Sequence, residues 1–566
     1  MLAASIMIRH VADDPVRAVV LAWRALPAPL RGCLRAAGPY GRAATLWGAG
    51  EGRAALAVLG ASPRRLAAFS LAVDQPRVAR DALARVPGHG PGGQARKRLA
   101  ARLAQREGRL TDALRALDGA RGWRARRLRR MIGAEQALLE PGTVRLGPGA
   151  LASGGHGTPG RVLHLVNDAL PTTNAGYTVR TQEIALAQRA AGMDPHVVTR
   201  IGFPVTDGTL DGRPLVTIDG VPYHRLLPWL MPQLADAAAQ RGAELAAALT
   251  ARLRPAVLHA ASNYANALTG IALREASGLP LVYEVRGFWE DTWLSRHAGD
   301  GVGDGPDLAD SERYRLSRDL ETWCMRQADL VVTLGEAMRE EILSRGVPRD
   351  KVIIVPNAVS GDFLRPLPEG GALRAGLGIR PGERVVGLVS SLAAHEGIGT
   401  LLEATAILTE RGLPVRALIV GDGPERAALQ RQAAALGLDA IFTGRVPVSK
   451  VREFHAVLDV FVVPRTRDRV CQLVTPLKPV EAMASGLPVV VSGVRALAEI
   501  VKDGVTGMLA TPQDPVSLAE RLERLLGDPG LRAKLGAAAR EWVAADRTWA
   551  QNAARYRDAY ARLGAL

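Results

Sequence analysis

The spacing of hydrophobic residues changes character near residue 150. Before that point, apolar residues recur at helical spacing, as in Ala95–Leu117. Clusters of Pro and Gly, such as Gly88–Gly93, separate these segments from one another. From residue 161 onward, short apolar runs alternate with amphipathic segments, which predicts parallel strands covered by helices on both faces. The pattern therefore predicts an all-α module followed by α/β domains.

Two alternating units follow each other in the second part of the chain. The strands predicted for them are Arg161–Val166, His196–Thr199, Val257–His259, Leu281–Val285, Leu330–Thr333 and Val352–Val355, then Val385–Val389, Ala417–Val420, Ile441–Thr443, Val460–Val463 and Val489–Val491. The fold class is α/β, with two Rossmann-like domains that face a cleft. The predicted parts are an all-α module at 1–150, a Gly- and Ser-rich linker at 151–160, Rossmann-like domains at 161–378 and 379–545, and a C-terminal helix at 546–566 that crosses back onto the first domain. Segment 299–307, dense in Gly and Asp, is predicted to be a loop beside the site.

The composition is that of a globular protein, with 48% hydrophobic and 23% charged residues. No apolar run approaches the roughly 20 residues that span a bilayer, and the N-terminus lacks a signal-peptide pattern. The cysteines Cys33, Cys324 and Cys471 are scattered and odd in number, which argues against a disulfide framework. We expect a cytoplasmic protein.

The positive charge of the chain is concentrated in its first quarter. Residues 1–150 hold 26 of the 72 Lys and Arg residues but only 10 of the 56 Asp and Glu residues. This asymmetry predicts a separate module with its own partner or environment. The run Arg121–Arg130 either forms a solvated helix face or contacts anionic lipid headgroups at the inner face of the cell membrane. Nucleic acid is not expected, because only Trp123 interleaves with the basic run. The turn at Arg106–Leu110 is faintly similar to that of tetratricopeptide-type repeats, without a clean period.

The stretch Arg465–Ser492 is the strongest candidate for binding chemistry. It is an Arg-rich loop followed by a short helix that begins near Leu477 and by the strand Val489–Val491. A helix start surrounded by basic residues suits a phosphate or diphosphate, and a Glu one turn later can accept hydrogen bonds from sugar or ribose hydroxyls. The residues in question are Arg465, Arg467, Arg469, Lys478 and Glu481. The alternative is an ordinary strand–loop–helix whose basic residues face water.

Other loops at the same sheet edge add to this candidate. In an open parallel sheet, ligands bind outside the carboxyl ends of the strands. The loops that follow strands of the second unit contain Ser390, Ser391 and Gly397, then Gly421, Asp422 and Gly423, then Arg445 and Val446. Their backbone N–H groups would hold phosphates, and Arg445 with Val446 would line a base. Each loop alone is a common turn, but four in this order predict a nucleotide-sugar site.

Six stretches carry a resemblance to a known family: Asn174–Arg180, Val355–Val359, Ile419–Arg426, Phe442–Pro447, Glu481–Val490 and Glu499–Gly507. With them, residues 161–563 resemble a retaining glycosyltransferase of family four with the GT-B fold. The resemblance implies a nucleotide-sugar donor in the cleft between the domains. It also implies that the acceptor, a glycan, a lipid-linked or another cell-surface molecule, is held mainly by the first Rossmann-like domain.

The chain departs from the family pattern at three places. The Glu that the family carries eight residues before Glu481 is Leu473 here, and the usual Arg and Lys after the first strand of the donor domain are Ser391 and Glu396. The usual His-Gly is Arg286-Gly287. These features resemble the subset of the family that builds bacterial surface polysaccharides. In that subset, we expect Arg465, Arg467 and Lys478 to supply the missing positive charge.

The resemblance assigns roles to individual residues. Arg286, Lys478 and Glu481 are the expected catalytic residues, and Asn174, Tyr177, Arg286 and Trp289 are expected to contact the acceptor. Gly176 would let the backbone approach the donor, although a Gly before a helix is often only a turn. The alternative for Arg286 is a structural ion pair with Glu284 or Glu290, and the alternative for Trp289 is buried packing.

No protein nucleophile stands out in the cleft loops, so we expect a front-side reaction in which the leaving diphosphate accepts the acceptor proton. No metal motif of the Asp-x-Asp type occupies these loops, so we expect neither a metal nor another cofactor. Two other interpretations remain. One is a different GT-B enzyme, such as a nucleotide-sugar epimerase or a phosphorylase. The other is a non-catalytic scaffold that binds sugar nucleotides or partner proteins.

Overall fold

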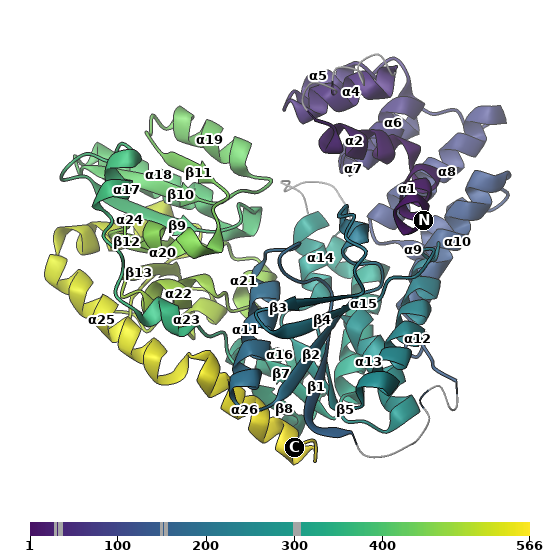
Figure 1. Ribbon diagram of the computed structural model, residues 1–566. Helices are drawn as coiled ribbons and strands as arrows, with labels where there is room; N and C mark the ends of the chain where they lie inside the picture. Colours follow the sequence, from purple (N-terminus) through teal and green to yellow (C-terminus); the bar gives the residue numbers. More distant parts are fainter. Residues whose placement is uncertain (28–30, 32–37, 148–150, 152–156, 298–306) are drawn as a thin grey trace.

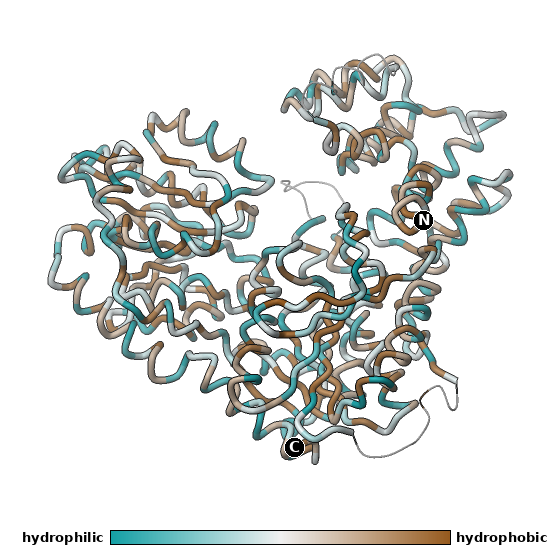
Figure 2. The backbone as a smooth tube through the Cα atoms, viewed as in Figure 1, coloured by the Kyte–Doolittle hydropathy of each residue, from teal (hydrophilic) through white to brown (hydrophobic). Residues whose placement is uncertain are grey.

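The computed structural model describes residues 1–27, 31, 38–147, 151, 157–297 and 307–566 (Figure 1). Most of the linker predicted at 151–160 and of the loop predicted at 299–307 lies outside these residues. The described chain forms two sheet-containing domains and a group of N-terminal helices, which confirms the predicted fold class. Figure 2 shows hydrophobic residues gathered along the central strands of both sheets, where helices cover them.

The N-terminal domain is built on an eight-stranded sheet in the order β3-β4-β2-β1-β5-β6-β7-β8. Its strands are parallel except for the hairpin of β3 and β4 at one edge. The prediction missed this hairpin, although β3 is composed of Leu-Val-Thr-Ile; its residues are alternately exposed and half-buried in the structure. The elements are β1 (Thr158–Val166), α11 (Gly176–Ala190), β2 (Asp194–Thr199), β3 (Leu215–Ile218), β4 (Val221–Arg225), α12 (Ala235–Leu253), β5 (Pro255–Ala261), α13 (Tyr264–Ser277), β6 (Leu281–Val285), α14 (Trp289–His297), α15 (Glu312–Gln327), β7 (Leu330–Thr333), α16 (Glu336–Ser344) and β8 (Val352–Ile354).

The C-terminal domain is built on a six-stranded parallel sheet in the order β11-β10-β9-β12-β13-β14. Strand β14, with only three residues, was not predicted. The elements are α17 (Gly371–Gly376), β9 (Arg384–Val389), α18 (Ile398–Glu410), β10 (Val415–Val420), α19 (Arg426–Ala435), β11 (Ile441–Gly444), α20 (Val451–His455), β12 (Val460–Val463), α21 (Arg469–Leu473), α22 (Lys478–Ala484), β13 (Val489–Ser492), α23 (Arg495–Ala498), β14 (Met508–Ala510), α24 (Pro515–Gly527) and α25 (Pro529–Asp546).

The last helix, α26 (Trp549–Arg562), leaves the C-terminal domain and packs against α11 of the N-terminal domain. In Figure 1, α25 and α26 (yellow) run along one side of the molecule from one domain to the other. Trp549, Tyr556 and Tyr560 of α26 are buried in one apolar cluster with strands β1, β5, β6 and β7. The crossing helix therefore completes the core of the N-terminal domain.

The N-terminal helices fall into two groups rather than one separate module. They are α1 (Leu2–Asp13), α2 (Pro15–Ala25), α4 (Pro39–Gly48), α5 (Gly52–Ala57), α6 (Pro63–Ala72), α7 (Pro76–Ala84), α8 (Gly90–Arg106), α9 (Leu110–Ala116) and α10 (Trp123–Leu138). Helices α2, α4, α5, α6 and α7 enclose a small core of their own around Phe69, with Leu99 of α8. Leu110 of α9 and Ile132 of α10 instead belong to the core of the N-terminal domain. The basic part of the chain is thus anchored to that domain. Among the described helices, none has both the length and the apolar composition needed to cross a bilayer.

Candidate functional site

The first residue of α22 lies at the centre of a charged cluster at the carboxyl edge of the six-stranded sheet. The Lys478 ammonium donates to Ser390 Oγ at 2.5 Å and to Glu396 Oε1 at 2.5 Å. Arg465 donates to the Val474 carbonyl at 2.9 Å and lies 3.4 Å from the same Glu396 oxygen. From the sequence, Lys478 and Arg465 were expected to bind a phosphate. Glu396 was not predicted as their counter-ion. Two cations and one carboxylate leave the cluster with one net positive charge.

Burial and the two cations act in opposite directions on Glu396. Its side chain is only 4% exposed, and such burial alone favours the neutral acid. Lys478 and Arg465 outweigh this effect and hold the pKa of Glu396 well below its usual range. Burial in turn lowers the pKa of Lys478, and Glu396 opposes this. The carboxylate therefore stays ionised and fixes the direction of the ammonium group.

Glu481 lies one turn further along α22, and its carboxylate has no hydrogen bond or ion pair with the described residues. Burial raises its pKa to about 7, against an opposing effect of Lys478, and Glu183 of α11 raises it further. Because Glu183 belongs to the N-terminal domain, Glu481 faces that domain across the cleft. An unpaired carboxylate in a cleft is suited to accept hydrogen bonds from ligand hydroxyls.

The glycines of the donor loops let neighbouring loops touch. A Cβ at Gly397 would lie 2.0 Å from the Pro464 carbonyl oxygen, and one at Gly421 would lie 1.7 Å from that of Ser390. A Cβ at Gly423 would lie 2.3 Å from the Leu392 oxygen. The sequence analysis predicted that the loops containing these glycines hold phosphates through their backbone N–H groups. In the structure, the contact between loops already excludes a side chain at all three positions.

The remaining predicted donor residues are more exposed. Ser391, Asp422 and Arg445 are exposed, and Val446 is half-buried against the domain core. The exposed Arg467 donates from Nε to the Pro512 carbonyl at 3.2 Å, and its backbone N–H donates to Gln513. The predicted role of Arg467 in binding the diphosphate therefore needs correction, because its guanidinium is turned toward residues 512–513 rather than toward Lys478.

On the opposite side of the cleft, Arg286 has the structural partner that the sequence gave as its alternative. Its Nε lies 3.1 Å from Glu284 Oε1, and its NH1 donates to the Tyr177 carbonyl and to Thr181 Oγ1. The side chain is 8% exposed. Its expected catalytic contact with a phosphate would require these bonds to break. The guanidinium instead ties the end of β6 to the first turns of α11.

Arg180 is the residue of this region that sequence reasoning missed. Its guanidinium is fully buried and donates to Glu284 at 2.7 Å, to the carbonyl oxygens of Val355 and Pro356, and to Tyr556 of α26. It thereby joins β6, the start of the connection between the domains and the crossing helix. A signal was present in the sequence, because Arg180 lies on the same helix face as the buried Ile184, one turn later.

The other predicted acceptor residues lie near the first turn of α11 or on α14. Asn174 is exposed, and Tyr177, 43% exposed, donates to Asp168 Oδ2 at 2.8 Å. A Cβ at Gly176 would meet only Leu477, at an ordinary contact distance of 3.6 Å. This contact places the start of α11 directly against the start of α22. Trp289 is half-buried against the apolar core, in agreement with the alternative of buried packing.

Leu473, which replaces the family Glu, is 4% exposed and belongs to the apolar core of the N-terminal domain. It ends α21, which packs against α14 and α16 of that domain. Arg469 at the other end of α21 pairs with Asp291 at 3.2 Å and with Glu341 at 2.7 Å. The missing carboxylate thus has an apolar substitute that joins the two domains.

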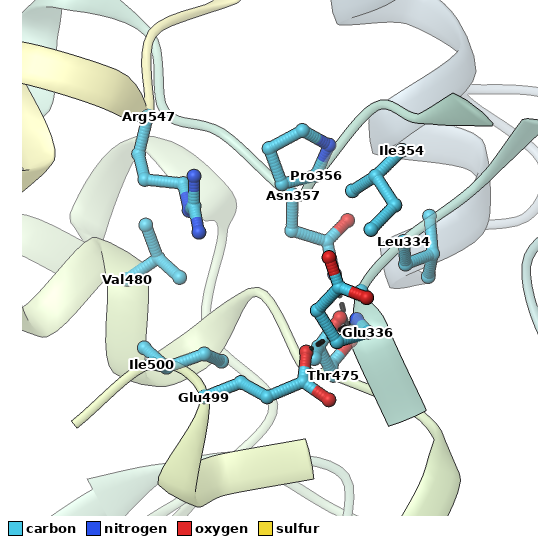
Figure 3. Close-up of a pocket in the computed structure, with 11 residues that line it drawn as sticks. Leu334, Glu336, Ile354, Pro356, Asn357, Thr475, Val480, Glu499, Ile500 and Arg547 are labelled. Carbon is cyan, nitrogen blue, oxygen red and sulfur yellow. Dashed lines mark hydrogen bonds between the residues drawn. The ribbon is translucent and has the colours of Figure 1, made fainter. Parts of the chain in front are cut away.

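A pocket of about 330 Å³ lies between the domains next to this contact (Figure 3). Glu499 of the C-terminal domain accepts hydrogen bonds from the backbone N–H groups of Glu336 and Ala337 at the start of α16, at 2.7 and 2.5 Å. The Asn357 amide donates to the Thr475 carbonyl at 2.7 Å. Figure 3 shows Arg547 on the opposite wall from Leu334 and Glu336. These bonds explain the Glu499–Gly507 stretch as part of the domain contact.

Among the described residues, no group of three or more His, Cys, Asp or Glu side chains is placed to hold a metal ion. Independence from metals and cofactors stays a prediction.

Two family models match the chain over its two sheet-containing domains. Residues 175–358 match the glycosyl transferase 4-like domain, and residues 371–542 match glycosyl transferases group 1. The chain is 30% identical over 240 residues to 2-deoxystreptamine glucosyltransferase of Streptomyces kanamyceticus, which covers 42% of this chain and 61% of that protein. It is 31% identical over 266 residues to D-inositol 3-phosphate glycosyltransferase of Nocardia farcinica; this match covers 44% of this chain and 56% of that protein. The chain thus spans less than two thirds of the length of these two relatives.

Solved structures share the fold at low sequence identity. Sucrose-phosphate synthase of Thermosynechococcus elongatus superposes with a TM-score of 0.57 at 21% identity, covering 72% of this chain and 99% of that one. HepE of Anabaena in complex with UDP superposes with a TM-score of 0.54 at 20% identity, covering 71% and 100%. The chain therefore contains a glycosyl transferase 4-like domain followed by a glycosyl transferases group 1 domain, arranged in the GT-B fold.

Proposed function

We propose that this protein is a retaining glycosyltransferase that moves a hexose-type sugar from a nucleotide-diphosphate donor to a glycan, a lipid-linked or another cell-surface acceptor. The observation that carries the proposal is the arrangement at the start of α22. A cluster with one net positive charge, formed by Lys478, Arg465 and Glu396, adjoins the unpaired carboxylate of Glu481. The first feature suits a diphosphate and the second suits sugar or ribose hydroxyls.

The charge of this cluster defines its role in the reaction. As the sugar leaves, negative charge builds up on the diphosphate, and a preorganised cation at that position lowers the barrier. Lys478 is suited to this role because Glu396 and Ser390 hold its ammonium in place before the donor arrives. Removing one such charge-assisted contact should raise the barrier by about 2–4 kcal/mol. The leaving diphosphate would itself accept the acceptor proton, because no protein nucleophile is predicted in the cleft loops.

In this proposal, fewer residues than expected supply the positive charge that replaces the missing family Arg and Lys. Lys478 and Arg465 supply the positive charge, and Arg467 does not, since its guanidinium is bonded to the Pro512 carbonyl. Glu396, at the position of a family Lys, orients Lys478 instead of contacting phosphate. Site residues on the acceptor side are Asn174 and Tyr177, which are exposed at the start of α11.

The acceptor class is open to experiment within this proposal. The two relatives are named for acceptors that carry a ring of hydroxyl groups, 2-deoxystreptamine and D-inositol 3-phosphate. A test panel therefore combines such cyclitols with oligosaccharides and lipid-linked sugars. A cytoplasmic enzyme that works at the inner face of the cell membrane would meet the lipid-linked members of this panel.

The test begins with a thermal-shift screen of UDP-, GDP- and ADP-sugars. A donor present at a hundred times its dissociation constant should stabilise the protein by about 2.7 kcal/mol. Lys478→Ala should weaken binding of that donor, whereas the matched control Lys450→Ala, an exposed lysine of the same domain paired with Glu453, should leave it unchanged. If Lys478→Ala bound the donor as tightly as the wild type, Lys478 would not supply the missing positive charge.

Turnover separates the proposal from its alternatives. Addition of an acceptor should release free nucleoside diphosphate and give a product with the anomeric configuration of the donor, observed by NMR. An epimerase would change the donor sugar without an acceptor. A scaffold would bind the donor and turn over no member of the panel.

A further inference from the structure

The N-terminal helices enclose a groove that is separate from the cleft between the two sheets. It has a volume of about 880 Å³ and is lined by residues of α1, α2, α6, α8 and α10. In Figure 1, these helices (purple to blue) lie against the N-terminal domain, and the six-stranded domain lies on the other side of the picture. The walls combine apolar side chains with five arginines: Arg64, Arg98, Arg102, Arg124 and Arg127.

Only two of these arginines have carboxylate partners. Arg102 pairs with Asp14, and Arg127 pairs with Asp13 at 2.5 Å. Within the described part of the chain, the other three, Arg64, Arg98 and Arg124, make no ion pair and no hydrogen bond. Arg124 lies over the Trp123 ring at 5.3 Å. Among the described residues, the groove therefore holds three positive charges without a counter-ion.

These three charges act on one another. Burial lowers the pKa of Arg98, and Arg124, Arg64 and Arg102 lower it further. A group of like charges held together in a partly buried groove is destabilising unless an anion neutralises it. The preferred ligand is therefore anionic and large enough to reach several guanidinium groups at once, as a phosphate does.

The apolar part of the groove lining faces solvent. Met7, Ile8 and Val11 of α1 are 70%, 68% and 53% exposed, and Trp123 at the start of α10 is 54% exposed. Met7 and Val11 are one turn apart, so they lie on the same face of α1 as neighbours. Isolated exposed apolar residues are common, but a continuous set beside unpaired arginines fits a ligand with both an anionic and an apolar part.

A second exposed apolar pair adjoins α1. Trp229 and Leu230 are 76% and 53% exposed. The next two residues are bonded to α1, since the Met231 N–H donates to Ser5 Oγ at 3.2 Å and Arg9 donates to the Pro232 carbonyl at 3.2 Å. These bonds hold the loop against the helix. Trp229 and Leu230 thus form a second exposed apolar site where the N-terminal helices meet the N-terminal domain.

We propose that this groove docks the protein on an anionic phospholipid bilayer. Arg64, Arg98 and Arg124 hold a lipid phosphate, and Met7, Ile8, Val11, Trp123, Trp229 and Leu230 enter the interface between headgroups and acyl chains. Trp is well suited to that interface because its ring is amphipathic. Basic residues near an anionic leaflet and apolar residues inserted in it are the two contributions that stable peripheral binding combines. The proposal concerns binding alone and does not depend on the reaction in the cleft.

Two other kinds of partner fit the groove less well. Nucleic acid would present a hydrophilic backbone to the exposed Met7, Ile8 and Val11, which would gain nothing from it. An acidic peptide would satisfy the arginines but would need apolar anchors at matched spacing to cover the same wall. The experiment includes such a peptide as a competitor.

The test measures sedimentation of the full-length chain with vesicles of phosphatidylcholine alone and of phosphatidylcholine with phosphatidylglycerol, without nucleotide sugar. Arg64→Gln/Arg98→Gln/Arg124→Gln should bind the anionic vesicles about 100-fold more weakly, from about fivefold per arginine near a charged surface. The matched control Arg53→Gln/Arg85→Gln/Arg126→Gln removes three exposed arginines of the N-terminal helical region that do not line the groove. The affinity of this control for anionic vesicles should fall by less than about tenfold, because the substitutions remove only long-range attraction between the protein and the charged membrane.

A second variant tests the apolar wall. Met7→Gln/Ile8→Gln/Val11→Gln should abolish the binding that survives at high salt, because salt screens the arginines but not the apolar insertion. No variant should melt below the wild type, since none of the substituted side chains is buried or has an ion pair in the described structure.

Three results would overturn the proposal. The first is an equal loss in the groove variant and in the matched control. The second is wild-type binding to phosphatidylcholine vesicles as tight as to anionic ones. The third is displacement of the protein from the vesicles by low concentrations of inorganic phosphate or of a poly-glutamate peptide, which would assign the groove to a soluble anion or to an acidic partner.

Discussion

The ion pair of Lys478 and Glu396 gives the sharpest test of the donor site. Lys478→Met removes the cation 2.5 Å from Glu396 and leaves this carboxylate, 4% exposed, with the more distant Arg465 at 3.4 Å and the imidazole of His395 at 3.6 Å. Breaking a buried pair from one side costs about 3–5 kcal/mol, because an uncompensated charge remains buried. Lys478 is itself 22% exposed and Arg465 remains, so we expect the lower end, about 3 kcal/mol.

The double variant Glu396→Gln/Lys478→Met distinguishes this cause from simple loss of packing. Removing both charges leaves no buried ion, and such replacements are often close to neutral. We expect the double variant to recover all but about 1 kcal/mol of the wild-type stability. The exposed pair of Lys450 and Glu453 serves as the control, and Lys450→Met should change stability by about 0–1 kcal/mol.

The pH dependence follows from the pKa of Glu396, which lies well below its usual range in the folded protein. The stability that this group contributes is therefore fully present above the unfolded pKa near 4.5 and is lost as the pH falls through the lower folded value. In Lys478→Met, burial raises the pKa of Glu396, so the acid takes up a proton more easily. The difference between wild type and variant should shrink as the pH falls from 8 to about 5.

The measurement is urea unfolding of the full-length chain at several pH values, combined with calorimetric titration of the donor found in the screen. The reasoning is refuted if Glu396→Gln/Lys478→Met is as unstable as Lys478→Met alone. It is equally refuted if the cost of Lys478→Met is the same at pH 8 and pH 5.

Three further predictions concern other contacts of the site. The protein should bind the donor more tightly as the pH rises from 6 to 8, because Glu481, with a pKa of about 7, accepts hydrogen bonds from ligand hydroxyls when it is ionised, and calorimetry on Glu481→Gln should show no such rise. Tyr560→Phe removes hydrogen bonds of the tyrosine hydroxyl with Gln188 and His259, so thermal unfolding should show a loss of about 1–3 kcal/mol; no loss would mean that α26 is not held by them. Glu499→Ala uncaps α16 and should cost about 1 kcal/mol, with faster hydrogen exchange confined to the first turn of that helix.

Short apolar runs predicted most strands with little error. Leu281–Val285 and Leu330–Thr333 agree with β6 and β7 residue for residue, since parallel strands buried on both faces need continuous apolar sequence. The β3–β4 hairpin was missed although Leu-Val-Thr-Ile of β3 favours a strand; it lies at the sheet edge, where exposed and half-buried residues alternate. The edge of the sheet therefore marks the limit of what local pattern predicts.

The site residues divide in the same way. Lys478 and Glu481 were found because a basic helix start followed by a carboxylate is a local signal. The partner of Lys478, Glu396, lies 82 residues away, and nothing in its own neighbourhood marks it as a counter-ion. Arg467 was assigned to the diphosphate by its charge and Arg286 to catalysis by the family resemblance, but the folded chain gives both of them protein acceptors.

By itself, the sequence determined the alternation of strands and helices, the order of the domains and the sheet edge that carries the polar loops. These depend on hydrophobic period and on turn residues, which act over a few neighbouring positions. Only the tertiary structure decided which charges neutralise one another, that α9 and α10 share the core of the N-terminal domain, and that three arginines of the N-terminal groove have no counter-ion. The physical reason is that an ion pair depends on distance in space, and residues far apart in the sequence meet only once the chain has folded.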